Sequence, residues 1–144
     1  MAATWLSAAA SFQDGLLQAL QGRSQPPGLE AALFAVRWAR DEAVKARLVI
    51  LYRRRDFFVT VPLRLRPEVE RLGADLDAAI SAFAQDFPGG AGLAAKERAA
   101  FLLIDLPSAA VRRYLAAGIS PPAGVEDFVR RAFLATAPAQ GKAD

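Results

Sequence analysis

The chain has 144 residues, 53% of them hydrophobic, so it is long enough to close one apolar core. It contains no cysteine and no histidine, which excludes disulfides, zinc sites built on these residues, and catalysis by Ser-His or Cys-His pairs. The net charge of +3 is too small to indicate nucleic-acid binding without clustering, and the longest uncharged apolar run, Ala99 to Ile104, is too short for a membrane span. With no basic segment ahead of its apolar N-terminus, the chain is expected to be cytoplasmic, without a cofactor, metal or membrane contact.

Apolar residues recur at the helical period along almost the whole chain, which predicts an all-α fold. In chain order, we expect about six helices. They cover residues 4–20, 29–40, a third helix with Asp41 as its N-cap that ends in Arg53–Arg55, and then 67–87, 93–117 and 125–137. The second is apolar nearly all round, which is typical of a helix in the middle of a bundle. Pro107 predicts a kink near Leu103. Residues 56–66 resemble a strand, but a lone strand would have no partner, so we expect an extended or one-turn connector.

The final third carries the most recognisable pattern. Residues Arg98–Ala137 read RAAFLLIDLPSAAVRRYLAAGISPPAGVEDFVRRAFLATA, an apolar helix with an internal Asp-x-Pro, then Ala-Val-Arg-Arg, a Gly-x-x-Pro-Pro turn and a closing helix with Phe and Val. Shorter phrases occur earlier, at Val36–Arg40, Lys45–Leu48 and Tyr52–Asp56. Together they make the chain resemble the C-terminal ligand-binding and dimerisation domain of bacterial TetR-family transcriptional regulators.

The resemblance implies a TetR-type C-terminal helical bundle in a single domain, 1–144. Residues 1–92 would form the pocket for a small, mostly apolar effector, 93–137 the dimerisation helices, and 138–144 a tail. The family places a helix-turn-helix domain before these helices, whereas here the first helix begins close to Met1 and no such pattern follows. DNA contact is therefore expected only through a domain absent from this chain. The chain would then be a fragment, have a misassigned start, or be a regulator-like protein without a DNA reader.

Candidate effector contacts are the aromatic residues on inward-facing helices and one carboxylate in an apolar run. They are Phe34, Trp38, Tyr52, Phe83, Phe87, Phe101 and Asp105. The sequence leaves a second interpretation open for each aromatic residue, namely ordinary core packing. For Asp105, the alternative to orienting a ligand is capping the helix that resumes after the Pro107 kink.

A homodimer is expected because the last helix needs a second apolar surface to cover it, and small residues on the preceding helix permit close approach. The candidate interface residues are Leu102, Leu106, Ala109, Ala110, Tyr114, Val125, Phe128, Val129, Ala132 and Phe133. The alternative function is a stand-alone helical dimerisation or interaction module with neither ligand nor DNA.

Charged groups give little support to other classes of function. The clusters Arg53–Arg55, Arg112–Arg113 and Arg130–Arg131 are better explained as a helix end and solvated helix faces than as DNA contacts. The carboxylate pairs are adjacent or two residues apart, so they do not share a helix face and are expected on solvated surface. These pairs are Asp41/Glu42, Asp75/Asp77 and Glu126/Asp127. We expect no catalytic residues; an enzyme using Asp105 and a tyrosine is the remote alternative.

Overall fold

The computed structural model describes residues 2–52 and 61–138, which are helical and contain no strand, so the predicted all-α class is confirmed. The elements are α1 (Ala2–Gln21), α2 (Leu29–Asp41), α3 (Ala43–Ala46) with the π turn η1 (Arg47–Leu51), the 3₁₀ turn η2 (Leu63–Leu65), α5 (Arg66–Ala84), α6 (Leu93–Ala100), the π turn η3 (Phe101–Asp105), α7 (Leu106–Ala116) and α8 (Gly124–Thr136). The turn η2 fits the predicted one-turn connector. Residues 56–60 of that connector, the Arg53–Arg55 cluster and residues 139–144 of the predicted tail lie outside the described residues.

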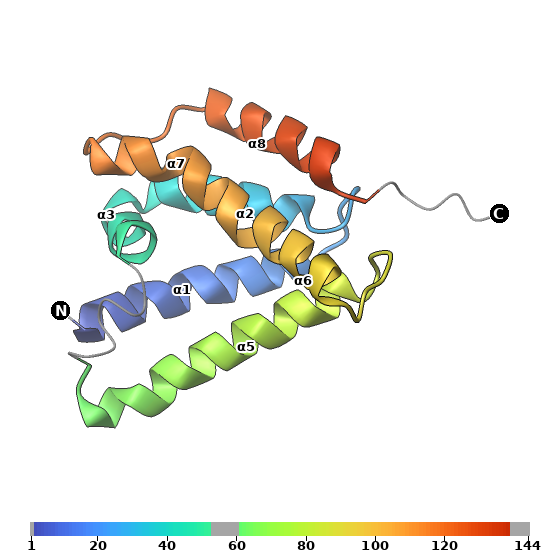
Figure 1. Cartoon of the computed structure of the whole chain (residues 1–144). Helices are drawn as coiled ribbons and strands as arrows, with labels where there is room; N and C mark the ends of the chain where they lie inside the picture. Colours follow the sequence, from blue (N-terminus) through green and yellow to red (C-terminus); the bar gives the residue numbers. More distant parts are fainter. Residues whose placement is uncertain (1, 53–60, 139–144) are drawn as a thin grey trace.

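The helices form layers that Figure 1 shows from the side. Helices α1 and α5 run next to each other along one side of the molecule, and α8 lies on the opposite side. Helix α2 lies between them and packs against α1, α7 and α8. The segment α6–η3–α7 crosses the bundle from α5 to α8. Among the described residues, no helix has both the length and the apolar character that crossing a membrane requires.

Helix α2 is the centre of the core, as expected for a helix that is apolar nearly all round. Leu33 and Val36 are fully buried, and the same core cluster takes in Leu102, Val111 and Phe133 from the last third of the chain. The predicted cap of the next helix is wrong in one respect. Asp41 is the last residue of α2, and α3 begins after Glu42, whose φ of −123° and ψ of 52° mark the junction without a side-chain cap.

The Pro107 disruption takes the form of a π turn at the predicted place. Pro107 has no N–H, and its ring would clash with the carbonyl of Leu103 in a regular α-helix. In the structure, the ladder widens over η3, where the N–H of Leu106 donates to the carbonyl oxygen of Phe101, five residues earlier. The chain therefore passes the proline without ending the helix, and α7 continues from Leu106.

An ion-pair network fastens α8 and the turn before it to α2. Glu126 accepts hydrogen bonds from Arg40 Nη1 at 2.9 Å and from Arg37 Nε at 3.1 Å, and Arg40 Nε donates to the carbonyl oxygen of Pro121 at 3.1 Å. The expectation that Glu126 lies on solvated surface is therefore wrong, since only 19% of its side chain is exposed. Helical spacing gives the face of a residue, but it cannot show that two arginines of α2 lie opposite that face.

The network also shifts the protonation equilibria of its members. Burial alone would raise the pKa of Glu126, but the hydrogen bonds and charges of Arg40 and Arg37 outweigh it and lower the pKa. Burial alone would lower the pKa of Arg37, but Glu126 and Glu30 raise it. Both shifts favour the charged forms, so the network is an ionised clamp across most of the pH scale.

Candidate functional site

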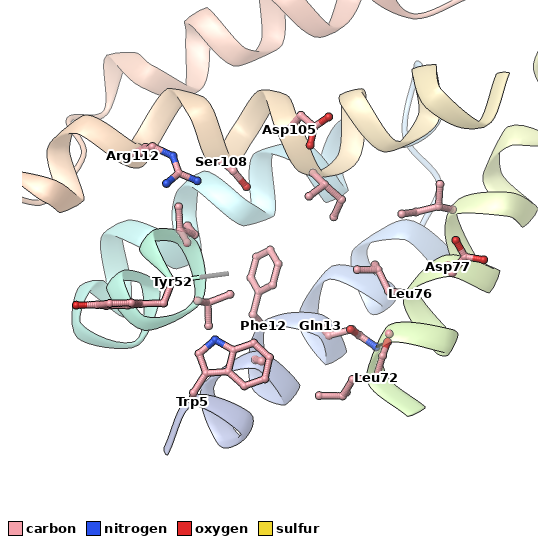
Figure 2. A pocket seen from close by; sticks show the side chains of 16 residues that line it. Trp5, Phe12, Gln13, Tyr52, Leu72, Leu76, Asp77, Asp105, Ser108 and Arg112 are labelled. Atoms are coloured by element: carbon pink, nitrogen blue, oxygen red, sulfur yellow. Dashed lines mark hydrogen bonds between the residues drawn. The ribbon is translucent and has the colours of Figure 1, made fainter. Parts of the chain in front are cut away.

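A cavity of about 590 Å³ opens between α1, α5, η1 and the η3–α7 segment. Its apolar walls come from all four of these elements. They are formed by Trp5, Ala9, Phe12, Val49, Ile50, Leu72, Leu76, Ile80 and Ile104 (Figure 2). Both π turns of the described chain border it, η1 through Val49 and Ile50 and η3 through Ile104 and Asp105. Widened helical turns are often found at functional sites, so this coincidence favours the cavity as the candidate site.

Helix α1 connects the cavity to the main core. The Phe12 ring lies 5.0 Å from the ring of Trp38 and 6.0 Å from that of Phe34, measured between centroids, so both aromatic residues of α2 support it from behind. The next residue, Gln13, is buried and donates from Nε2 to the carbonyl oxygen of Leu72 at 3.0 Å. That hydrogen bond ties α1 to α5 across the cavity wall, so the position of α1 depends on the groups that line the cavity.

Charged and hydroxyl groups at the cavity come mainly from one wall. Asp105, Ser108 and Arg112 lie at i, i+3 and i+7 on the η3–α7 segment, a spacing that places side chains on one helix face. Asp77 of α5 also borders the cavity, and Lys96 Nζ pairs with its Oδ1 at 2.9 Å. Asp105 makes no capping hydrogen bond, so the capping alternative is wrong. Its carboxylate belongs to the cavity wall.

The predicted effector contacts divide into three groups. Tyr52 and Asp105 line the cavity, although Figure 2 shows the Tyr52 ring directed away from the other lining side chains. Phe34 and Trp38 lie one layer behind it, against Phe12. Phe101 is 39% exposed and does not border the cavity.

Phe83 and Phe87 lie farther along the bundle, with ring centroids 5.0 Å apart. Phe83 borders a second cleft, of about 620 Å³, between the C-terminal part of α1, the turn after it and α5. That cleft is bordered largely by exposed residues at the end of α1 and in the turn after it, such as Gln21, Arg23 and Gln25. The first cavity, by contrast, has helical walls that include buried Trp5 and Gln13, so it is the better candidate for a small-molecule site.

The predicted interface residues also divide. Four of them, Leu102, Val125, Val129 and Phe133, are buried in the core of the single chain. Leu106, Ala110, Tyr114 and Ala132 are half-buried, and only Ala109 and Phe128 are exposed. The contact of the exposed residues with a second copy stays a prediction.

Sequence reasoning missed most of the lining residues. Gln13, Ser108 and Arg112 were not singled out as contacts, although each is a polar residue close to the apolar stripes of its helix. The i, i+3, i+7 spacing from Asp105 is a signal that could have found the last two. No comparable signal exists for Leu72 and Leu76, because a lining leucine and a core leucine follow the same period.

Within the ranges 2–52 and 61–138, no three acidic side chains gather as they would around a metal ion. Comparison of the chain with protein-family models, curated proteins and solved structures finds no match. The cavity is apolar with a few polar groups at its edge, a composition that is typical of small-molecule sites.

Proposed function

We propose that the chain is the effector-binding and dimerisation domain of a TetR-like transcriptional regulator that senses a small, mostly apolar molecule. The observation that carries the binding part is the cavity of about 590 Å³ with mainly apolar walls and a polar edge on one helix. Its volume lies within the range of roughly 300–1,000 Å³ that is usual for small-molecule sites. The regulatory part rests on the sequence resemblance of Arg98–Ala137 and the shorter phrases before it.

Effector binding would act through helix α1. Trp5, Ala9 and Phe12 line the cavity, and Gln13 ties the same helix to α5. A ligand can shift a conformational equilibrium only by its difference in affinity for the two states. A molecule that fits between α1 and α5 in one packing and not in another therefore changes where α1 lies. In a regulator, that displacement would pass to whatever α1 is connected to.

A cavity-blocking variant tests the binding. Ile104→Trp places a larger ring at the cavity wall, and Ile119→Trp is the matched control on an exposed residue outside it. With 1-decanol as the apolar probe, we expect the Tm of the original chain and of Ile119→Trp to rise with ligand concentration. At a ligand concentration a hundred times Kd, the free energy of unfolding should be higher by ~2.7 kcal/mol. Ile104→Trp should show no rise. An equal rise in all three proteins would contradict binding in this cavity.

Dimerisation is proposed through the outer face of α8. Phe128 and Leu134 are exposed to 66% and 53%, and large apolar side chains on one outer helix favour contact with a second copy. Phe128→Glu should convert a dimer into a monomer in light scattering after size exclusion. Leu93→Glu is the control, because Leu93 is 72% exposed but lies on α6. A monomeric original chain would contradict the proposal.

The second candidate is a helical interaction module that binds no ligand. The exposed apolar residues of α8 are the observation that favours it, since they need a partner but no effector. It predicts a dimer whose Tm does not change with 1-decanol, either in the original chain or in Ile104→Trp. A ligand-dependent Tm rise that Ile104→Trp abolishes decides against it.

A further inference from the structure

The two charged ends of the cavity have opposite signs. Asp105 and Arg112 lie seven residues apart on one helix face, a rise of about 10 Å at 1.5 Å per residue. Figure 2 shows Asp105 and Asp77 on one side of the cavity, and the Arg112 guanidinium on the other side with the Ser108 hydroxyl between. The polar edge of the cavity therefore has an acidic end, at Asp105 and Asp77, and a donor end, at Arg112 and Ser108.

The donor end has no compensating carboxylate among the described residues. Asp77 and Asp105 are the only acidic residues of the lining, and both belong to the opposite end. Arg112 forms no ion pair or hydrogen bond with the described part of the chain, so its guanidinium is available. Ser108 lies one helical turn from Arg112 on the same face, so its hydroxyl can donate to the same ligand group.

Below this edge the cavity is a strip of hydrocarbon. Phe12, Leu76, Ile80 and Ile104 line it. Figure 2 shows Phe12 below Ser108 and Leu76 toward the acidic end. An elongated apolar body would bury its surface on these side chains, which is the main source of affinity in such sites. A group at one end of that body would then meet Arg112, whose planar fork matches a carboxylate.

We propose that the effector of this cavity is a monocarboxylic acid with an elongated hydrocarbon body, its carboxylate held by Arg112 and Ser108. This inference rests on the proposed small-molecule function and names the ligand class of the same site. The acidic end gives the selectivity: a second carboxylate at the far end of the ligand would lie near Asp105 and be repelled, whereas Asp77 is already paired with Lys96. An alcohol of the same length would keep the apolar contacts and lose the charge-assisted hydrogen bonds.

The chain provides a matched control in the adjacent arginine. Arg113 Nη2 donates to the hydroxyl of Tyr114 at 2.8 Å, the Arg113 guanidinium lies 4.9 Å from the Tyr114 ring centre, and Arg113 does not line the cavity. Arg112→Gln and Arg113→Gln therefore remove the same charge from the same helix. Only the first removes it from the cavity.

The test is calorimetric titration of the full chain at neutral pH with decanoate, 1-decanol and decanedioate. We expect decanoate to bind about tenfold more tightly than 1-decanol, and decanedioate more weakly than decanoate. Arg112→Gln should abolish the preference for decanoate over 1-decanol, and Arg113→Gln should keep the preference. Asp105→Asn should narrow the difference between decanoate and decanedioate.

Several outcomes would overturn the inference. If 1-decanol binds and decanoate binds no better, the cavity is an effector site but the acid assignment is wrong. The same holds if Arg113→Gln removes the preference as fully as Arg112→Gln. If neither compound binds, the small-molecule function itself fails, and the inference fails with it.

Discussion

Apolar residues follow the same helical period on both sides of the molecule, but they form a filled core on one side and a cavity on the other. Around α2, α7 and α8, fully buried side chains such as Leu33, Val111 and Phe133 fill the core, and Glu126 locks the outer helix in place. Between α1, α5 and the π turns, apolar side chains instead surround a cavity of about 590 Å³. Side chains that border a cavity bury less apolar surface than side chains in a filled core, so the second side gives up stability that the first side keeps.

This difference in packing assigns the two sides different roles: the filled core contributes most of the stability, and the cavity side holds the candidate site. A protein interior packs as densely as an organic crystal, so a cavity of this size interrupts that packing and its walls need support from the residues behind them. Phe12 is held in this way by Phe34 and Trp38, and Gln13, itself part of the lining, ties α1 to the backbone of Leu72. In the proposed function, the dense side would be the scaffold on which the cavity side responds to a ligand.

The largest expected effect is a loss of stability when the same Leu→Ala truncation is made on the two sides of the molecule. Leu33→Ala should lower the free energy of unfolding by about 2–5 kcal/mol, because Leu33 is fully buried and its removal leaves a void. Leu76→Ala should cost only about 1 kcal/mol, since Leu76 is half-buried and already borders space. Urea unfolding measures both. Equal losses would show that the cavity is filled in solution and would remove the contrast.

A smaller effect comes from the clamp on α8. Glu126→Gln should lower the free energy of unfolding at neutral pH by about 1 kcal/mol, the value of charged hydrogen bonds that are partly screened by solvent. Because the pKa of Glu126 is lower in the folded chain, its contribution is complete above the usual pKa of a glutamate. It is lost as the pH falls through the lower pKa of the folded state.

Urea unfolding across the acidic range measures this dependence. The difference between the original chain and Glu126→Gln should shrink as the pH falls. Asp127→Asn is the control: Asp127 pairs with Arg131 on the same helix, with both side chains at least half exposed, so we expect a change of about 0.3–0.5 kcal/mol. A difference that stays constant with pH would mean that Glu126 acts through packing and not through its charge.

The smallest expected effect concerns filling the cavity. Ile104→Trp should change the free energy of unfolding by less than about 1 kcal/mol, because the added ring can enter existing space. Leu102→Trp, two residues earlier and fully buried, should cost about 1–3 kcal/mol or more by overpacking. Thermal unfolding of the two variants gives the comparison. Similar losses would indicate that residue 104 faces a tight core.

Much of the fold followed from the sequence because helix boundaries depend on local chemistry. The expected helix over 29–40 corresponds to α2 at Leu29–Asp41, and the expected end at 137 corresponds to α8 ending at Thr136. The disruption of the helix near Leu103 could be predicted from Pro107, since the missing N–H of a proline affects only the preceding helical turn.

The site followed less well because it depends on how helices meet. Val125, Val129 and Phe133 form one stripe with the period of an interface, yet α2 and α7 cover that stripe within the chain. Asp105 could be singled out as a carboxylate in an apolar run. That Arg112 would stand at the far end of the same cavity depends on the place of α1 and α5, which no local pattern specifies.

The π turn η3 gives the helix one residue more without changing which way α7 faces. Its five residues cover the arc that about four residues cover in a regular α-helix, so Ser108 and Arg112 keep the face that lines the cavity. Deleting one residue within Phe101–Asp105 would leave that face in place, but a regular turn would bring the Pro107 ring against a carbonyl of the preceding turn. At this place, we expect a single-codon deletion to destabilise the helix rather than to redirect the cavity wall.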